Sequence, residues 1–335
     1  MIHINEWARQ VRAGERRMVI PIMTHPGIEL CGRRVVEAVK DGQVHAEAIL
    51  RLDSVYPSDG VTAIMDLTVE AEAFGATVEF ADDEIPNVTG RLVYDEQTVQ
   101  ALQVPSLDAG RISQYLEANR LVVERISGKP VFGGCAGPFS LAGRLFGLSE
   151  MMMALYMSPV LIQELLEKCT AFILDYCAAM KRLGLDGVIM AEPAAGLVSN
   201  DDCITYSSVY VKWIVERLQD DDFMIVLHNC GNAGHCTDAM VKSGAAALHF
   251  GNKINMVEAL KQVPEDVLVM GNVDPVNTFK FLSEQQVYDT VLGLLRDTAG
   301  WRNYILSTGC DVPPHVSHKN IEAFYRAVHD FNLSK

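Results

Sequence analysis

The chain of 335 residues lacks the segments that would place it in a membrane. No stretch reaches the roughly 18 uninterrupted apolar residues that a spanning helix needs. Residues 1–17 are charged and contain no apolar core segment, so they match neither a signal peptide nor a transit peptide. We therefore expect a cytoplasmic protein with no membrane partner.

Positive charge is also scarce. The 28 Lys and Arg residues are outnumbered by 43 Asp and Glu residues, which gives a formal net charge of −15, and no basic run is longer than a pair. A molecule with this charge repels nucleic-acid phosphates and anionic lipids. Nucleic acid is therefore not an expected partner.

The cysteines show no spacing typical of a disulfide framework. Eight of them are dispersed along a long chain, a distribution typical of reducing compartments. Cys169 and Cys177 fall in a helical pattern that begins near Ser158 and Pro159, and we expect both thiols to be core residues. The remaining cysteines are Cys31, Cys135, Cys203, Cys230, Cys236 and Cys310.

Short apolar runs alternate with longer stretches of helical spacing along the whole chain. Hydrophobic residues make up 49% of the sequence and charged residues 21%, which suits a chain that buries a full core. Near-continuous apolar strands alternating with helices predict a parallel sheet covered on both faces. The predicted strands are 18–23, 61–66, 130–135, 186–191, 224–229, 246–250, 267–271 and 304–308.

These eight strands predict an α/β protein with a closed (β/α)8 TIM barrel, in a single domain over residues 1–335. Residues 79–105 interrupt the alternation, and we interpret them as an irregular N-terminal β excursion over the barrel mouth. A doubly wound open sheet is the alternative fold. It is less suitable because no G-x-G-x-x-G follows an early strand and polar residues follow nearly every strand.

Three of the polar residues at strand ends have the chemistry of a metal site. His228 and Cys230 stand two apart at the end of a strand, so their side chains point the same way. Cys310 follows the last strand, which a closed barrel returns to the same mouth. One His and two Cys leave a fourth position open on Zn²⁺, as in catalytic zinc sites. A zinc-bound thiol loses its proton and becomes a nucleophile suited to alkyl transfer.

Two other interpretations of these residues stay open. His228, Cys230 and Cys310 are ordinary core residues in one of them. In the other, His228 and Cys230 form a compact structural site with His235 and Cys236, although these two residues more naturally begin the following helix. Glu192, Asp66 and His25 also follow predicted strands and are candidate catalytic residues.

Several segments resemble the uroporphyrinogen decarboxylase superfamily and, within it, the methylcobamide:coenzyme M methyltransferase branch. The matching segments are MDLTVEAEAFGATVEF, GPFSLAGRLFG, HNCG, MGNVDP and STGCDVPP. The resemblance implies that His228, Cys230 and Cys310 bind zinc. It also implies methyl transfer between the methylcobamide (corrinoid) of a carrier protein and a small thiol, such as coenzyme M, or a folate acceptor.

The chain departs from the family in two places. The stretch IPIMTHPGIELCGRR has no arginine at the strand end, where the porphyrin decarboxylases hold substrate carboxylates. The stretch HFGNK has Gly251 and Asn252 where related enzymes present an acidic residue near zinc. The fourth ligand is then His249, a water or the substrate.

Met23, Cys135 and Asn272 lie at or near the ends of predicted strands and are candidate residues for contact with the corrinoid. Two further functions remain open: a metal-free carboxy-lyase of the same superfamily, and a barrel that binds a ligand without catalysis. The direction of transfer, the acceptor and a homodimeric state also stay open.

Overall fold

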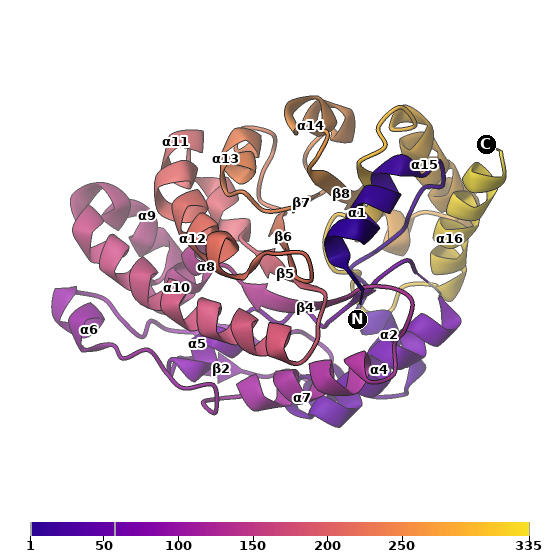
Figure 1. Ribbon diagram of the computed structural model, residues 1–335. Helices are drawn as coiled ribbons and strands as arrows, with labels where there is room; N and C mark the ends of the chain where they lie inside the picture. Colours follow the sequence, from indigo (N-terminus) through magenta and orange to yellow (C-terminus); the bar gives the residue numbers. More distant parts are fainter. Residues whose placement is uncertain (1, 57, 335) are drawn as a thin grey trace.

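A computed structural model describes residues 2–56 and 58–334 and has an α/β fold built on a curled parallel sheet (Figure 1). Seven strands follow the order β1-β4-β5-β6-β7-β8-β9, and all neighbours are parallel. They are nearly fully buried, as expected for strands covered on both faces. The strands are β1 (Val61–Thr62), β4 (Val131–Ala136), β5 (Gly187–Ala191), β6 (Met224–Asn229), β7 (Ala247–Phe250), β8 (Leu268–Val273) and β9 (Tyr304–Thr308).

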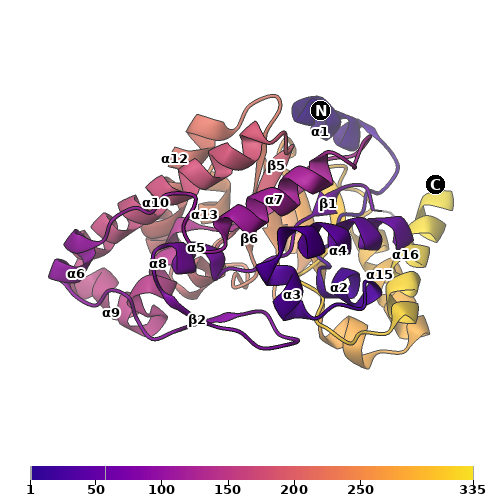
Figure 2. The same cartoon turned by 90° about the horizontal axis from the view of Figure 1, so that it is seen from below.

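Helices connect these strands, and α4 lies between α7 and α16 at one side of the molecule (Figure 2). The predicted helix near residue 158 is α10, which has Pro159 as its first residue. The α-helices are α1 (Ile4–Ala13), α2 (His25–Leu30), α3 (Val35–Lys40), α4 (Gly42–Val55), α5 (Val69–Ala73), α6 (Glu96–Ala101), α7 (Ile112–Val123), α8 (Pro138–Phe146), α9 (Leu148–Met157), α10 (Pro159–Arg182), α11 (Asn200–Cys203), α12 (Val209–Leu218), α13 (Thr237–Lys242), α14 (Met256–Gln262), α15 (Glu284–Asp297) and α16 (His318–Leu333). One 3-10 helix, η1 (Pro193–Leu197), and two π-helices, η2 (Ile204–Ser208) and η3 (Asn277–Phe281), are also present.

The prediction of a regular strand at 18–23 is wrong. This segment forms one parallel bridge, between Val19 and Leu306 of β9. Pro21 has no backbone N–H to donate, so a continuous ladder cannot run through it. The segment nevertheless contacts β1 as well, because the Thr62 hydroxyl donates a hydrogen bond of 3.2 Å to the Pro21 carbonyl.

Helix α1 packs against the amino-terminal part of the sheet. Its apolar residues Ile4, Trp7 and Val11 join a buried cluster that contains the first residues of β6, β7 and β8. Apolar burial of this kind is the main force that holds the helix there. The carboxyl-terminal edge of the sheet is thereby left for polar side chains.

The region predicted as an irregular β excursion contains the antiparallel pair β2 (Thr77–Glu79) and β3 (Asn87–Thr89). The chain after this hairpin is held to α8, because the backbone N–H groups of Leu92 and Val93 donate to the Leu145 carbonyl. An ion pair of 3.0 Å between Arg34 and Asp82 ties the hairpin loop to the start of α3.

None of the described helices combines the length and apolar character that crossing a lipid bilayer requires.

Candidate metal centre and its surroundings

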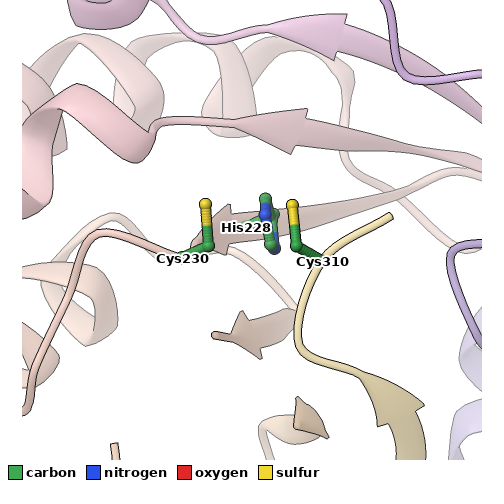
Figure 3. Close-up of side chains that lie close together, drawn as sticks. All are labelled: His228, Cys230 and Cys310. Atoms are coloured by element: carbon green, nitrogen blue, oxygen red, sulfur yellow. The ribbon is translucent and has the colours of Figure 1, made fainter. Parts of the chain in front are cut away.

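One imidazole and two thiols meet at the carboxyl-terminal edge of the sheet (Figure 3). His228 lies in β6, Cys230 follows that strand, and Cys310 lies two residues beyond the end of β9. One ligand atom from each side chain lies within 4.8 Å of the other two. Figure 3 shows the imidazole between the two thiols, so the structure brings together the three residues that the sequence predicts as ligands.

Two glycines permit this close approach. A Cβ atom at Gly251 would lie 2.6 Å from the Cα of Cys230, and a Cβ at Gly309 would lie 2.6 Å from the backbone nitrogen of Asn252. Distances this short cannot be accommodated without moving backbone atoms, because non-bonded carbons prefer separations of about 3.5–4.0 Å. Packing against Cys230 therefore excludes a carboxylate side chain at position 251.

The two thiol sulfurs lie within 4.8 Å of each other and affect each other's pKa. The interaction with Cys310 lowers the pKa of Cys230, and the same interaction, together with burial, raises the pKa of Cys310. The charge of Lys253 also lowers the pKa of Cys230. Cys230 is thus the readier thiolate, and a metal cation binding both sulfurs would displace the proton from Cys310.

His249 lies behind His228 and uses both of its ring nitrogens. Its Nδ1 is 2.8 Å from Nδ1 of His228, and its Nε2 is 2.8 Å from the Ser307 hydroxyl oxygen. Burial, followed by the proximity of His228, lowers the pKa of His249 well below its usual value, so the ring is neutral. With both nitrogens engaged, His249 has no free lone pair with which to be a fourth ligand.

The alternative cluster with His235 and Cys236 does not form. The His235 ring nitrogen Nε2 is 3.1 Å from the Val198 carbonyl, and the Cys236 thiol lies 3.7 Å from the Ala195 carbonyl. Among the residues that the structure describes, His228, Cys230 and Cys310 are the group of His, Cys and carboxylate side chains with suitable metal-ligand spacing.

Glu192 follows β5 and is 1% exposed. Its two carboxylate oxygens accept hydrogen bonds of 2.9 and 2.8 Å from the backbone N–H groups of Phe139 and Ser140 at the start of α8. Burial raises the pKa of Glu192 to about 7, although these bonds oppose the shift. A carboxyl group that titrates near neutral pH is suited to proton transfer, so Glu192 stays a candidate for that role.

Asp66 lies at the same edge but is enclosed in a hydrogen-bond network. Its Oδ2 accepts bonds of 2.6 Å from Arg111 and 3.0 Å from the Tyr115 hydroxyl, and its Oδ1 accepts from Thr68. All of these partners are buried. These contacts give Asp66 a structural role as the acidic partner in a buried ion pair, and this role requires no substrate.

The other predicted candidates have mainly structural contacts. His25 Nδ1 is 3.0 Å from the Val312 carbonyl, which ties the first residue of α2 to the loop after Cys310. Met23 is buried in the main core, and the Cys135 thiol lies 3.6 Å from the Cys177 thiol. The Asn272 amide donates to the carbonyls of Gly251 and Ile254 and thereby holds the loop after β7.

A pocket of about 410 Å³ lies against Cys230. It contains two cations that sequence reasoning did not single out, Arg144 of α8 and Lys253 in the loop after β7. Among the described residues no hydrogen bond or ion pair is found for Arg144; burial lowers its pKa, and the nearby charges of Glu70 and Asp66 oppose that shift. The lining residues are Ser140, Gly143, Arg144, Leu148, Pro193, Ala194, Leu197, Cys230, Gly231 and Lys253.

Sequence reasoning also missed Glu70, a carboxyl group of α5 that is 1% exposed. One oxygen accepts a hydrogen bond of 2.8 Å from the Ala136 N–H, and the other, Oε2, has no hydrogen-bond partner among the described residues. Burial raises the pKa of Glu70 to about 7. Its sequence signal was weak, because Glu70 and Glu72 both lie in one short helical pattern and only the fold shows which is buried.

The family model described as Uroporphyrinogen decarboxylase (URO-D) matches residues 15–331, and the chain therefore belongs to this family. Among curated proteins, the chain is 27% identical over 299 residues to "Methylcobamide:CoM methyltransferase MtbA" of Methanosarcina acetivorans, which covers 88% of this chain and 86% of that protein. It is also 24% identical over 307 residues to a uroporphyrinogen decarboxylase of Hahella chejuensis, covering 89% and 85% of the two chains. These relatives confirm the resemblance predicted from the sequence motifs.

Solved structures agree on the fold. A methyltransferase from Methanosarcina mazei matches with a TM-score of 0.87 at 22% identity, over 97% of each chain. A B12-independent methionine synthase from a Shewanella strain matches with a TM-score of 0.58 at 16% identity, over 88% of this chain and 90% of that one. At these identities the likeness concerns the fold alone.

Proposed function

We propose that this protein is a zinc-dependent methyltransferase that moves a methyl group between the methylcobamide of a corrinoid carrier protein and a small thiol similar to coenzyme M. The observation that carries the proposal is the convergence of His228, Cys230 and Cys310 at the carboxyl-terminal edge of the sheet. The 27% identity to a methylcobamide:CoM methyltransferase over 88% of the chain supports the choice of reaction.

The donor set of these three residues fits zinc. Imidazole nitrogen and thiolate sulfur bind Zn²⁺ at about 2.0–2.3 Å, and three protein ligands leave one tetrahedral position for a substrate. Zinc held there would stabilise the thiolate form of the acceptor. Cys230 and Cys310 supply two negative charges that keep a further bound sulfur electron-rich, while neutral His228 adds none.

The pocket against Cys230 is the proposed site of the acceptor thiol. Arg144 and Lys253 offer positive charge inside a protein with a net charge of −15, and Leu148 and Leu197 offer apolar walls. A short thiol with an anionic end suits this arrangement, because a partly buried cation whose hydrogen bonds no described side chain accepts gains from an anion. The new bond joins the acceptor sulfur to the methyl carbon, and the cobalt–carbon electron pair stays on the corrinoid.

The same proposal includes a closed (β/α)8 barrel in one domain. Segment 18–23 would occupy the eighth position, since it contacts both β9 and β1. The β2–β3 hairpin would cover part of the mouth, since its neighbouring segments are held to α3 and α8. The corrinoid carrier would then dock over the remaining opening, near Glu192.

The test is methyl transfer from methylcobalamin to coenzyme M by the native protein, with and without a strong chelator. We expect chelation to abolish transfer, added zinc to restore it, and Cys230→Ser to lower the rate at least about 100-fold. Cys31→Ser is the matched control, because that thiol lies outside the cluster. Unchanged transfer after complete metal removal would contradict the proposal. Decarboxylation of uroporphyrinogen by the metal-free protein would favour the carboxy-lyase alternative instead.

A further inference from the structure

A line of three buried side chains runs from the thiol–imidazole cluster into the interior of the sheet. His228 and His249 are direct neighbours in the parallel register of β6 and β7, and Ser307 lies in β9. The exposed fractions of these side chains are between 0% and 2%. The ring centroids of the two histidines are 4.7 Å apart with an interplanar angle of 67°, so the rings meet by an edge rather than by stacking.

The 2.8 Å contact between the two Nδ1 atoms requires one proton between them. Two protons would bring two N–H groups together, and none would oppose two lone pairs. The proton is therefore on one ring, and the tautomers of the two histidines are linked. The Ser307 hydroxyl lies 2.8 Å from His249 Nε2 and can accept a hydrogen bond from it or donate one to it, so this contact fits either arrangement and binding of a metal at Nε2 of His228 would select one of them.

We propose that His249, supported by Ser307, holds His228 in the tautomer that presents the lone pair of Nε2 to zinc. His228 then carries its proton on Nδ1 and donates it to Nδ1 of His249, which carries its own proton on Nε2 and donates it to the Ser307 hydroxyl. In the reverse arrangement, Nε2 of His228 would carry the proton and could not bind a metal. His249 is thus a positioning residue that contacts neither zinc nor substrate.

Because His249 is neutral, it adds no charge to the proposed metal site. Histidine ligands of metals usually donate their second N–H to a carboxylate, a carbonyl or a water. The partner here is a neutral imidazole, which orients His228 without adding negative charge beside two thiolates. The proposed cluster can therefore accept a third, anionic sulfur at lower electrostatic cost than one supported by a carboxylate.

The inference rests on the proposed zinc site, and its test separates the two. Zinc dissociation constants are measured by competition with a chromophoric chelator for the native protein, His249→Leu, His249→Gln and Ser307→Ala. We expect His249→Leu to weaken zinc binding by about 10–100-fold. His249→Gln should stay within a few-fold of native, because its amide can accept from His228 and donate to Ser307. Ser307→Ala should give a smaller loss than His249→Leu.

The second readout needs no variant. Long-range ¹H–¹⁵N correlation spectra of the native zinc-loaded protein report which ring nitrogen of each histidine is protonated. We expect a proton on Nδ1 of His228 and on Nε2 of His249. Native zinc affinity in a folded His249→Leu protein would overturn the positioning role of His249 and leave the zinc site intact. A proton on Nε2 of His228 in the zinc-loaded protein would overturn that role and also remove His228 from the proposed ligands. Absence of zinc binding by the native protein would overturn both.

Discussion

The two halves of the carboxyl-terminal edge present different chemistry. The half formed by β6, β7 and β9 presents His228, Cys230 and Cys310, whose ligand atoms lie within 4.8 Å of one another. The other half, formed by β1, β4 and β5, is followed by the carboxyl groups of Asp66, Glu70 and Glu192. Most of their oxygens are already bound by backbone N–H groups or by Arg111.

In the first half the side chains lie close together and are available to a ligand. In the second half the side chains are bonded to other parts of the protein. The thiols and the imidazole place one ligand atom each within 4.8 Å of the others, as metal ligands do. The carboxylates instead tie α5, α7 and α8 to the strand ends. Substitutions should therefore affect zinc in one half and stability in the other.

The largest effect on stability is expected from Arg111→Ala. Arg111 forms a 2.6 Å ion pair with Asp66, and both side chains are buried. Its removal leaves an uncompensated buried carboxylate, which we expect to lower the free energy of unfolding by about 3–5 kcal/mol. Urea denaturation measures the change, and the zinc content of the folded protein should not fall.

The matched control is Arg120→Ala, which removes an exposed ion pair with Glu117 and should change stability little. Equal losses for the two variants would show that the buried pair has no special role.

The pH dependence of stability tests the carboxylate half through Glu70. Burial raises the pKa of Glu70 from 4.5 to about 7 in the folded protein. Between these values the unfolded chain loses its proton while the folded chain keeps it, so stability falls as pH rises through this window. The loss should reach roughly 3 kcal/mol at pH 8 relative to pH 4.

Glu70→Gln removes this ionisation, so its unfolding free energy should fall less steeply with rising pH than that of the native protein. Denaturant titrations at several pH values give the slope, and Glu265→Gln is an exposed control that should keep the native slope. Identical slopes for native protein and Glu70→Gln would refute the assignment.

Arg144→Gln should have a smaller effect, and it should weaken substrate binding rather than lower the stability of the fold. Loss of a charge-assisted hydrogen bond to an anionic acceptor should raise KM for coenzyme M by about 10–100-fold. Lys253→Gln should raise KM by a smaller factor, because Lys253 is exposed. Steady-state kinetics with 2-mercaptoethanol, which has no anionic end, provide the control. An equal KM increase for both thiols would contradict charge recognition by Arg144.

Most of the strand positions could be predicted from the sequence, because parallel strands buried on both faces have continuous apolar sequences. The prediction failed at 18–23, where the apolar pattern is strand-like but Pro21 cannot take part in a ladder. The spacing of two between His228 and Cys230 predicted a shared direction for their side chains. The proximity of Cys310 to His228 and Cys230 could be predicted only by assuming where the last strand lies in the sheet.

Other features depend on distant contacts that no local pattern contains. Asp66 lies between β1 and α5, whereas Arg111 lies 45 residues later, just before α7, and their sequence positions give no sign that they pair. From the sequence, Gly251 stands where related enzymes present an acidic residue. The packing against Cys230 shows that this position has no room for a side chain. His249 was a candidate ligand until the contacts of both its nitrogens were known.

The most direct test of the account is the zinc content of protein purified without added metal, for the native chain, Cys310→Ser and Cys31→Ser. The account predicts about one zinc per chain in the native protein and in Cys31→Ser, and none in Cys310→Ser. A folded native protein without zinc, or a Cys310→Ser protein that retains it, would contradict the assignment of His228, Cys230 and Cys310 as a metal centre.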